Sequence, residues 1–130
     1  MKLKPILTRH APYFPVGDVE SAGNYYQTIL GFEKEYAAGV PIQFAIYQRD
    51  GLSIMFRRVT DSSKIIPNEA QGGTWDAFFW VNDVKSLFEE LQTNGAIIVY
   101  GVIYQESYNM DEFAIRDLNG YVLGFGQARK

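Results

Sequence analysis

The segment Val81-Asn82-Asp83-Val84 has a close counterpart in Val16-Gly17-Asp18-Val19, 65 residues earlier in the chain. In both segments an aspartate stands directly before a run with apolar residues at helical spacing. Aspartate is favoured at this position because its carboxylate accepts hydrogen bonds from the first backbone N–H groups of a helix. The first run stops at Gly31 and the second at Asn94-Gly95, which favour helix ends. We therefore expect two helices at equivalent places in the chain.

Strand-like sequence surrounds each of these helices. The run 12–16 precedes the first helix and the run 75–81 precedes the second, and β-rich stretches follow at 44–57 and 97–125. Each half also contains a hairpin signal, Asp50-Gly51 or Asn119-Gly120. The order strand, helix, strands therefore occurs twice, which predicts an α+β fold. We place the first module at about 10–58, a polar linker at about 60–74 and the second module at about 75–127, within one domain spanning 1–130.

Composition limits the classes of function. The chain has 130 residues, of which 47% are hydrophobic, and this is enough for one core without disulfides. Its net charge of −3 argues against a nucleic-acid partner, and the absence of cysteine excludes a thiolate metal site and a cysteine nucleophile. No apolar run approaches the ~20 residues that cross a bilayer. We expect a cytoplasmic protein without a membrane partner.

The order of these segments resembles the vicinal oxygen chelate superfamily, which contains glyoxalases, extradiol dioxygenases and bleomycin resistance proteins. The resemblance rests on Tyr13–Val19 leading to Leu30-Gly31-Phe32, then on Phe79–Val84, and finally on Phe113–Tyr121. It implies paired βαβββ modules that form a curled mixed sheet around a half-open cavity. In this superfamily the cavity is usually completed in a homodimer, so we expect a second copy as a partner.

Metal-using members of the superfamily carry His or Glu at four cavity positions, which the resemblance places at Ala11, Met55, Asp76 and Gly124. Ala and Gly offer no ligand atom, Met is a soft ligand, and one carboxylate alone does not hold a divalent ion. The only histidine, His10, is one position away from Ala11, and a shift of one turns a strand side chain to the other face. We therefore expect no metal and no cofactor, and we favour a binding protein over an enzyme.

Strand alternation extends the cavity face from Asp76 to Phe78 and Trp80, and it turns Trp75 and Phe79 toward the helices. The same rule extends the face from Met55 to Ser53 and Arg57. This pattern is similar to the metal-free bleomycin resistance proteins, which bind a cationic antibiotic without altering it. The resemblance matches their stacking aromatics to Phe44 and Phe78 and places a further stacking position at Asn109, beside Tyr108. It also matches Pro12 to the proline from which their N-terminal arm crosses to the partner subunit.

An alternative place for Phe44 is the core. Phe44 and Phe113 each stand seven residues before a hairpin glycine, and we expect Phe113 to be a core residue. The hypothesis for the whole chain is a homodimeric, metal-free protein that binds an aromatic or cationic small molecule, bleomycin-type antibiotics included. The candidate ligand-binding residues are Phe78, Asp76, Phe44, Trp80, Met55, Tyr108, Asn109 and Glu112. One alternative is a metal-dependent lyase or dioxygenase that uses His10 with Asp76 and Glu106 or Glu112. Another is a non-catalytic dimeric module whose cavity has become core.

Overall fold

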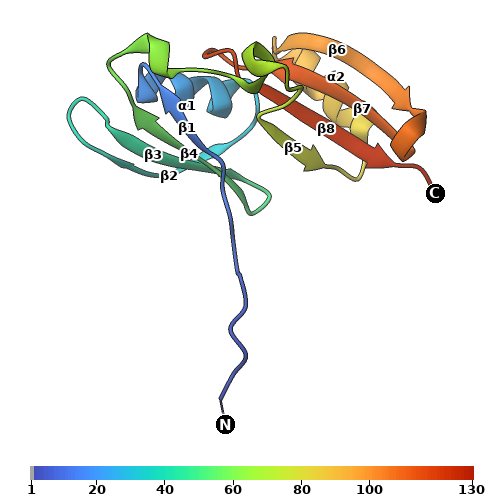
Figure 1. The fold of residues 1–130 in the computed structure, drawn as a ribbon, viewed down its shortest axis with the longest axis horizontal. Helices are drawn as coiled ribbons and strands as arrows, with labels where there is room; N and C mark the ends of the chain where they lie inside the picture. Colours follow the sequence, from blue (N-terminus) through green and yellow to red (C-terminus); the bar gives the residue numbers. More distant parts are fainter. Residues whose placement is uncertain (1) are drawn as a thin grey trace.

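The computed structural model describes residues 2–130 and contains two modules of the same design (Figure 1). The first contains β1 (Tyr13–Val16), α1 (Val19–Thr28), β2 (Glu33–Ala38), β3 (Phe44–Arg49) and β4 (Leu52–Arg58). The second contains β5 (Ala77–Trp80), α2 (Val84–Thr93), β6 (Ile97–Gln105), β7 (Met110–Arg116) and β8 (Val122–Ala128). The predicted α+β fold with two βαβββ modules is confirmed.

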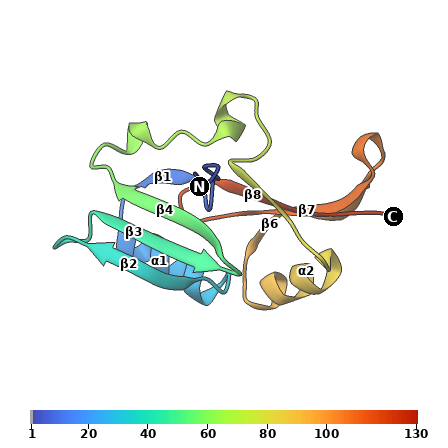
Figure 2. The ribbon, with the colours of Figure 1, turned by 90° about the horizontal axis from the view of Figure 1, so that it is seen from below.

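Each module forms one four-stranded mixed sheet, with the strand order β1-β4-β3-β2 in the first and β5-β8-β7-β6 in the second. The first strand of each module runs parallel to the last, and the other pairs are antiparallel. Each helix packs against its own sheet (Figure 2). We call the face of each sheet that is turned away from its helix the open face.

Aspartates cap both helices, as the sequence predicts. The Asp18 carboxylate accepts hydrogen bonds from the backbone N–H groups of Glu20, at 3.0 Å, and Ser21. The Asp83 carboxylate accepts the backbone N–H of Ser86 at 3.1 Å and also its hydroxyl, and these bonds lower the pKa of Asp83. Both caps satisfy helix N–H groups that would otherwise lack a partner.

The hydrophobic core is continuous across the two modules. Phe14 of β1 stacks on Tyr121, which directly precedes β8, with 4.3 Å between the ring centroids. The fully buried Tyr26 of α1 donates its hydroxyl to Asp117 at 2.7 Å. These contacts join residues about a hundred positions apart in sequence and fix the two sheets relative to each other.

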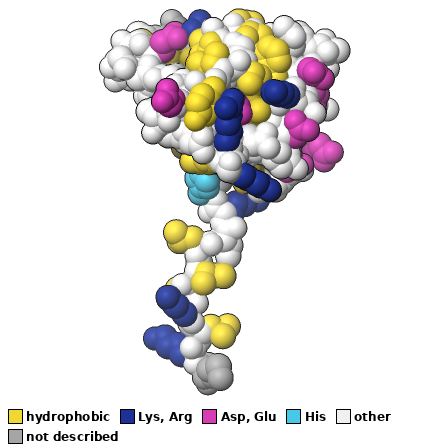
Figure 3. Space-filling view, turned by 90° about the vertical axis from the view of Figure 1, so that its right-hand side faces the viewer, with side chains coloured by type: hydrophobic (Ala, Val, Ile, Leu, Met, Phe, Trp, Pro, Cys, Tyr) yellow, Lys and Arg dark blue, Asp and Glu magenta, His cyan; other side chains and the backbone are white. Residues whose placement is uncertain are grey.

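Residues 2–12 form an N-terminal arm without helix or strand that extends away from both sheets (Figures 1 and 3). Its apolar side chains are exposed: Leu3 by 83%, Ile6 by 76% and Leu7 completely. The arm meets the body at Arg9, which donates to the Ser53 hydroxyl at 2.6 Å. Within the described residues, neither helix is long and apolar enough to cross a membrane.

Candidate functional site

Three aromatic rings gather at the open face of the second sheet, beside β5. The ring centroids of Trp75 and Phe78 are 4.7 Å apart, and those of Phe78 and Trp80 are 5.1 Å apart. Two glycines of β8 lie beneath these rings. A Cβ added to Gly124 would lie 2.7 Å from both Trp75 and Phe78, and one added to Gly126 would lie 2.7 Å from Phe78. The rings can therefore rest on the sheet because β8 has no side chains at these two positions.

The direction of Trp75 differs from the prediction. Phe79 faces the helix side as expected, where it stacks on Phe125 at 5.2 Å. Trp75, however, lies over Gly124 on the open face. Strand alternation does not apply to it, because β5 begins only at Ala77.

Glu112 of β7 lies on the same open face and is completely buried. Tyr100 of β6 and Tyr108, from the short 3-10 helix η3 (Glu106–Tyr108), both donate their phenolic hydroxyls to its carboxylate. The indole Nε1 of Trp75 donates in turn to the Tyr100 hydroxyl at 2.9 Å. We call Trp75, Tyr100, Tyr108 and Glu112 the Glu112 cluster. It connects the aromatic rings beside β5 to a carboxylate.

The two phenols of the Glu112 cluster act as neutral donors. Desolvation, together with the hydrogen bond to Glu112, raises the pKa of Tyr108 to about 12. The same two causes raise the pKa of Tyr100, which is more deeply buried. Both phenols therefore keep their protons near neutral pH, and the carboxylate is the acceptor. The ion pairs formed within residues 2–130 involve other carboxylates: Glu35, Asp50, Glu69, Glu90 and Asp111.

Asp76 has two backbone partners. One carboxylate oxygen accepts the N–H of Asn68 at 2.8 Å, at the start of the 3-10 helix η2 (Asn68–Gln71), and the other accepts the N–H of Val122 at 2.9 Å. Asp76 thereby ties the linker to the beginning of β8. Because both oxygens are already engaged, this carboxylate is less available to a ligand than the sequence suggests.

The four positions that hold a metal in related proteins do not fit one here. Ala11 has no donor atom, Met55 is a soft ligand, and the Asp76 carboxylate is engaged by backbone groups. The space beside Gly124 is filled by two aromatic rings. Among residues 2–130 no three or more His, Asp or Glu side chains are grouped to hold a metal, and His10 is exposed in the N-terminal arm.

The open face of the first sheet carries its own aromatic group. Phe44 contacts Tyr13 and Tyr36, with ring centroids 6.0 and 6.2 Å apart. The guanidinium of Arg57 lies 5.9 Å from the Tyr13 ring centroid, and Met55 is beside Tyr13 in the strand register. Of the two roles considered for Phe44, the structure supports the open face and not the core.

The comparison of Phe44 with Phe113 fails because the two hairpin turns differ in length. In the first module Arg49 pairs with Leu52 across two turn residues, whereas in the second Arg116 pairs with Val122 across five. Counting back from the turn glycine therefore does not reach the same face. Phe113 is fully buried in the core.

Asn109 helps to shape the turn between β6 and β7. Its backbone has a positive φ of 55°, a conformation that Asn tolerates better than most residues. Its side chain accepts the Tyr104 hydroxyl at 2.9 Å and donates to the carbonyl of Arg129 at 2.9 Å. Tyr108, one residue earlier, is the aromatic side chain that this turn presents to Glu112.

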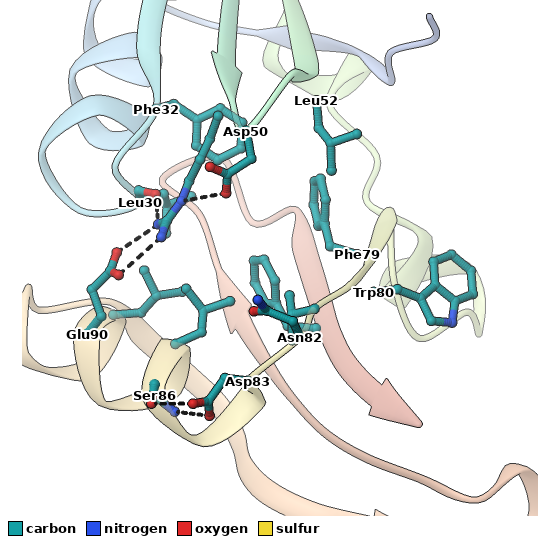
Figure 4. A pocket seen from close by; sticks show the side chains of 15 residues that line it. Leu30, Phe32, Asp50, Leu52, Phe79, Trp80, Asn82, Asp83, Ser86 and Glu90 are labelled. Carbon is teal, nitrogen blue, oxygen red and sulfur yellow. Dashed lines mark hydrogen bonds and ion pairs between the residues drawn. The ribbon is translucent and has the colours of Figure 1, made fainter. Parts of the chain in front are cut away.

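A separate groove of about 460 Å³ lies between the modules (Figure 4). It is mainly apolar, and the bidentate ion pair of Arg49 with Glu90, at 2.7 and 3.1 Å, lies at its border. Trp80 is the only candidate residue on its lining, and in Figure 4 its indole points away from the other lining side chains. The apolar lining residues include Leu30, Phe32, Leu52, Phe79, Leu87 and Phe125.

The sequence prediction named Phe78, Trp80, Tyr108 and Glu112, which the structure brings together around one open face. It did not name Trp75 or Tyr100 as site residues, although they link Phe78 to Glu112. Regular alternation could not place Tyr100, because the register of β6 shifts on both sides of it. Phe44 and Met55 lie on the other sheet.

Residues 7–125 match the model of the Glyoxalase/Bleomycin resistance protein/Dioxygenase superfamily. The chain belongs to this superfamily. The predicted relationship is therefore confirmed, and the paired modules described above are the superfamily's architecture in this chain. No curated protein matches the chain in sequence.

Solved structures share the superfamily fold at low sequence identity. TioX from Micromonospora sp. ML1 has a TM-score of 0.74 at 22% identity, covering 94% of this chain and 99% of that chain. The bleomycin-binding protein from Streptomyces verticillus, solved with copper(II)-bleomycin, has a TM-score of 0.72 at 20% identity, covering 98% and 100%. A glyoxalase-related enzyme from Clostridium phytofermentans has a TM-score of 0.76 at 11% identity, covering 98% and 100%. The likeness extends to both a binding protein and an enzyme, so it establishes the fold alone.

Proposed function

We propose that this member of the superfamily is a metal-free protein that binds an aromatic or cationic small molecule on the open face of its second sheet. The observation that carries the proposal is the group of three rings, Trp75, Phe78 and Trp80, resting over Gly124. Aromatic rings offer a planar ligand large contact areas at low cost in side-chain entropy. Trp80 is 72% exposed, so its ring is available for such contact.

Two further features support binding. The metal-binding positions of related enzymes lack a ligand set here, which favours sequestration over catalysis. The bleomycin-binding protein of Streptomyces verticillus has the same fold and holds copper(II)-bleomycin. A bleomycin-type antibiotic is therefore a suitable first ligand to test, and a role in antibiotic resistance would follow from its sequestration.

The proposed binding unit is a homodimer. The open faces carry uncovered aromatic side chains, and the N-terminal arm exposes Leu3, Ile6 and Leu7. A second copy would bury this apolar surface and enclose the site. Phe44 and Met55, on the open face of the first sheet, would then contribute from the other side of the cavity.

Calorimetric titration tests this function. Wild-type protein is titrated with metal-free bleomycin and with a panel of planar aromatic cations, and we expect at least one of them to bind. Phe78→Ala should weaken that binding about tenfold, since one aromatic contact contributes roughly 0.5–1.5 kcal/mol beyond the area it buries. Ile97→Ala is the control, because it truncates an exposed apolar side chain at the start of β6 in the same sheet, outside the group of rings. Equal affinity of wild type and Phe78→Ala would contradict the proposed site.

A further inference from the structure

The carboxylate of Glu112 is unusual because it is buried without a positive partner. Its side chain is 0% exposed, and within the described chain it takes part in no ion pair. The two groups that donate to it, the hydroxyls of Tyr100 and Tyr108, are neutral. Burying a carboxylate charge is costly unless a cation or several donors compensate for it. A cation brought to this site would find a desolvated carboxylate already in place.

The two tyrosine partners are held to different degrees. Tyr100 is tied in turn to Trp75, whose indole donates to its hydroxyl, and it lies within β6. Tyr108 is 44% exposed and belongs to the short 3-10 turn between β6 and β7. The Tyr108 hydroxyl is therefore the partner that a ligand reaches first and can displace without disrupting a strand.

The carboxylate also lies next to the aromatic rings. Glu112 is opposite Gly126 in the register of β7 and β8, and the ring of Phe78 covers Gly126. The Glu112 cluster continues from the carboxylate through Tyr100 to Trp75, which contacts Phe78. A ring stacked on Phe78 could thus carry a positive group within reach of Glu112.

We propose that Glu112 is the anionic anchor of the ligand site and that a primary ammonium group on an aromatic ligand replaces the Tyr108 hydroxyl on its carboxylate. This inference rests on the proposed function and names the chemical group that the site selects. It assigns the anchor to Glu112 and not to Asp76. The partners of Asp76 are backbone N–H groups held by the fold, whereas one partner of Glu112 is the hydroxyl of the exposed side chain of Tyr108. Aromatic acids are excluded from the site because their charge repels Glu112.

Two probes with the same ring separate the anchor from the aromatic surface. Naphthylmethylammonium carries the cation, and naphthylmethanol replaces it with a neutral hydroxyl. Both are titrated into wild type, Glu112→Gln, Tyr108→Phe and the control Asp111→Asn, and binding is followed by amide NMR spectra that also report folding. Asp111 is the matched control because it adjoins Glu112 on β7 but pairs with Arg129.

The expected results differ for each variant. Wild type binds the ammonium about tenfold more tightly than the alcohol, and Glu112→Gln removes this preference. Tyr108→Phe deletes the competing hydroxyl, so affinity for the ammonium rises about threefold, more than affinity for the alcohol, whose neutral hydroxyl forms the weaker bond to the carboxylate. A purely structural Tyr108 would not produce this selective gain. Asp111→Asn should behave as wild type.

Other outcomes overturn the inference, and they distinguish it from the proposed function. If both probes bind equally and Phe78→Ala weakens both, the aromatic surface stands and the Glu112 anchor is wrong. If Glu112→Gln converts a dimer to a monomer in light scattering, Glu112 serves the subunit interface and the anchor is also wrong. If neither probe nor the calorimetric panel binds wild type, the proposed function fails and the anchor fails with it.

Discussion

Phe44 and Glu112 occupy equivalent positions on the open faces of the two sheets. Phe44 pairs with Arg57, and Arg57 stands two residues after Met55. In the same way Glu112 pairs with Gly126, which stands two residues after Gly124. The equivalence follows from the parallel pairs, in which Tyr13 is beside Met55 and Phe78 is beside Gly124. The repeated fold thus presents two chemically different surfaces.

This difference explains why the first sheet has no group equivalent to the Glu112 cluster among the described residues. In the second module the glycines leave room for rings to lie on the sheet, and a carboxylate stands beside them. In the first module the position equivalent to Gly126 is occupied by Arg57. Its guanidinium lies 5.9 Å from the ring centroid of Tyr13. A dimer that brought the two kinds of surface together would enclose a site with unlike walls.

Substitution of Gly124 tests the packing of the aromatic group. A Cβ at Gly124 would lie 2.7 Å from the rings of Trp75 and Phe78, so Gly124→Ala must displace them. We expect unfolding free energy to fall by about 1–3 kcal/mol in urea titration. Tryptophan fluorescence of the folded state should also change.

Gly17→Ala is the control for this experiment. A Cβ at Gly17 meets nothing within 4 Å, and the residue has no positive φ. The unfolding free energy of Gly17→Ala should therefore stay within about 0.5 kcal/mol of the wild-type value. If Gly124→Ala were as stable as Gly17→Ala, with unchanged fluorescence, the rings would not rest on β8 as described.

Asp117 makes a pH-dependent contribution to stability. It is 2% exposed, and desolvation raises its pKa, although bonds from Tyr26, Asn119 and Tyr121 act in the opposite direction. A carboxyl whose pKa is higher in the folded state favours folding when protonated, so its contribution falls as pH rises through the folded-state pKa. Removing the charge of Asp117 should therefore remove the desolvation cost that the buried carboxylate imposes on folding at neutral pH.

Asp117→Asn provides the comparison. The amide oxygen can keep both backbone N–H partners, and the Tyr26 hydroxyl can accept from the amide nitrogen. We expect the variant to be at least as stable as wild type at pH 7. As the pH falls toward 4, the stability of wild type should rise relative to that of the variant. Thermal unfolding at a series of pH values measures this difference. A gain of wild type over the variant as the pH rises would contradict the direction of the pKa shift.

The sequence predicted local features well and long-range partners poorly. The two capping aspartates and the repeated modules could be recognised because their signals lie within a few consecutive residues. The role of Asp76 depends on the N–H groups of Asn68 and Val122, the latter 46 residues away. Likewise, Trp75 and Tyr100 meet through the fold and have no shared sequence pattern.

Light scattering tests the expected homodimer. The mass at micromolar concentration should be about twice the 14.8 kDa of one chain. Replacing Leu3, Ile6 and Leu7 together by Ser should shift the protein toward the monomer, because these exposed side chains lose the apolar surface that a second copy would bury. Replacing the exposed Leu118 by Ser is the control. A wild-type mass near one chain would contradict the dimer.

The location of ligand binding tests the central claim most directly. Amide and indole NMR signals are recorded while the tightest-binding compound of the calorimetric panel is added. Binding on the open face predicts the largest shifts at Gly124, Gly126 and the indole N–H of Trp75, with small shifts at Ser86 and Leu87 in the groove between the modules. The reverse pattern, with shifts confined to Ser86, Leu87 and their neighbours in the groove, would contradict the account.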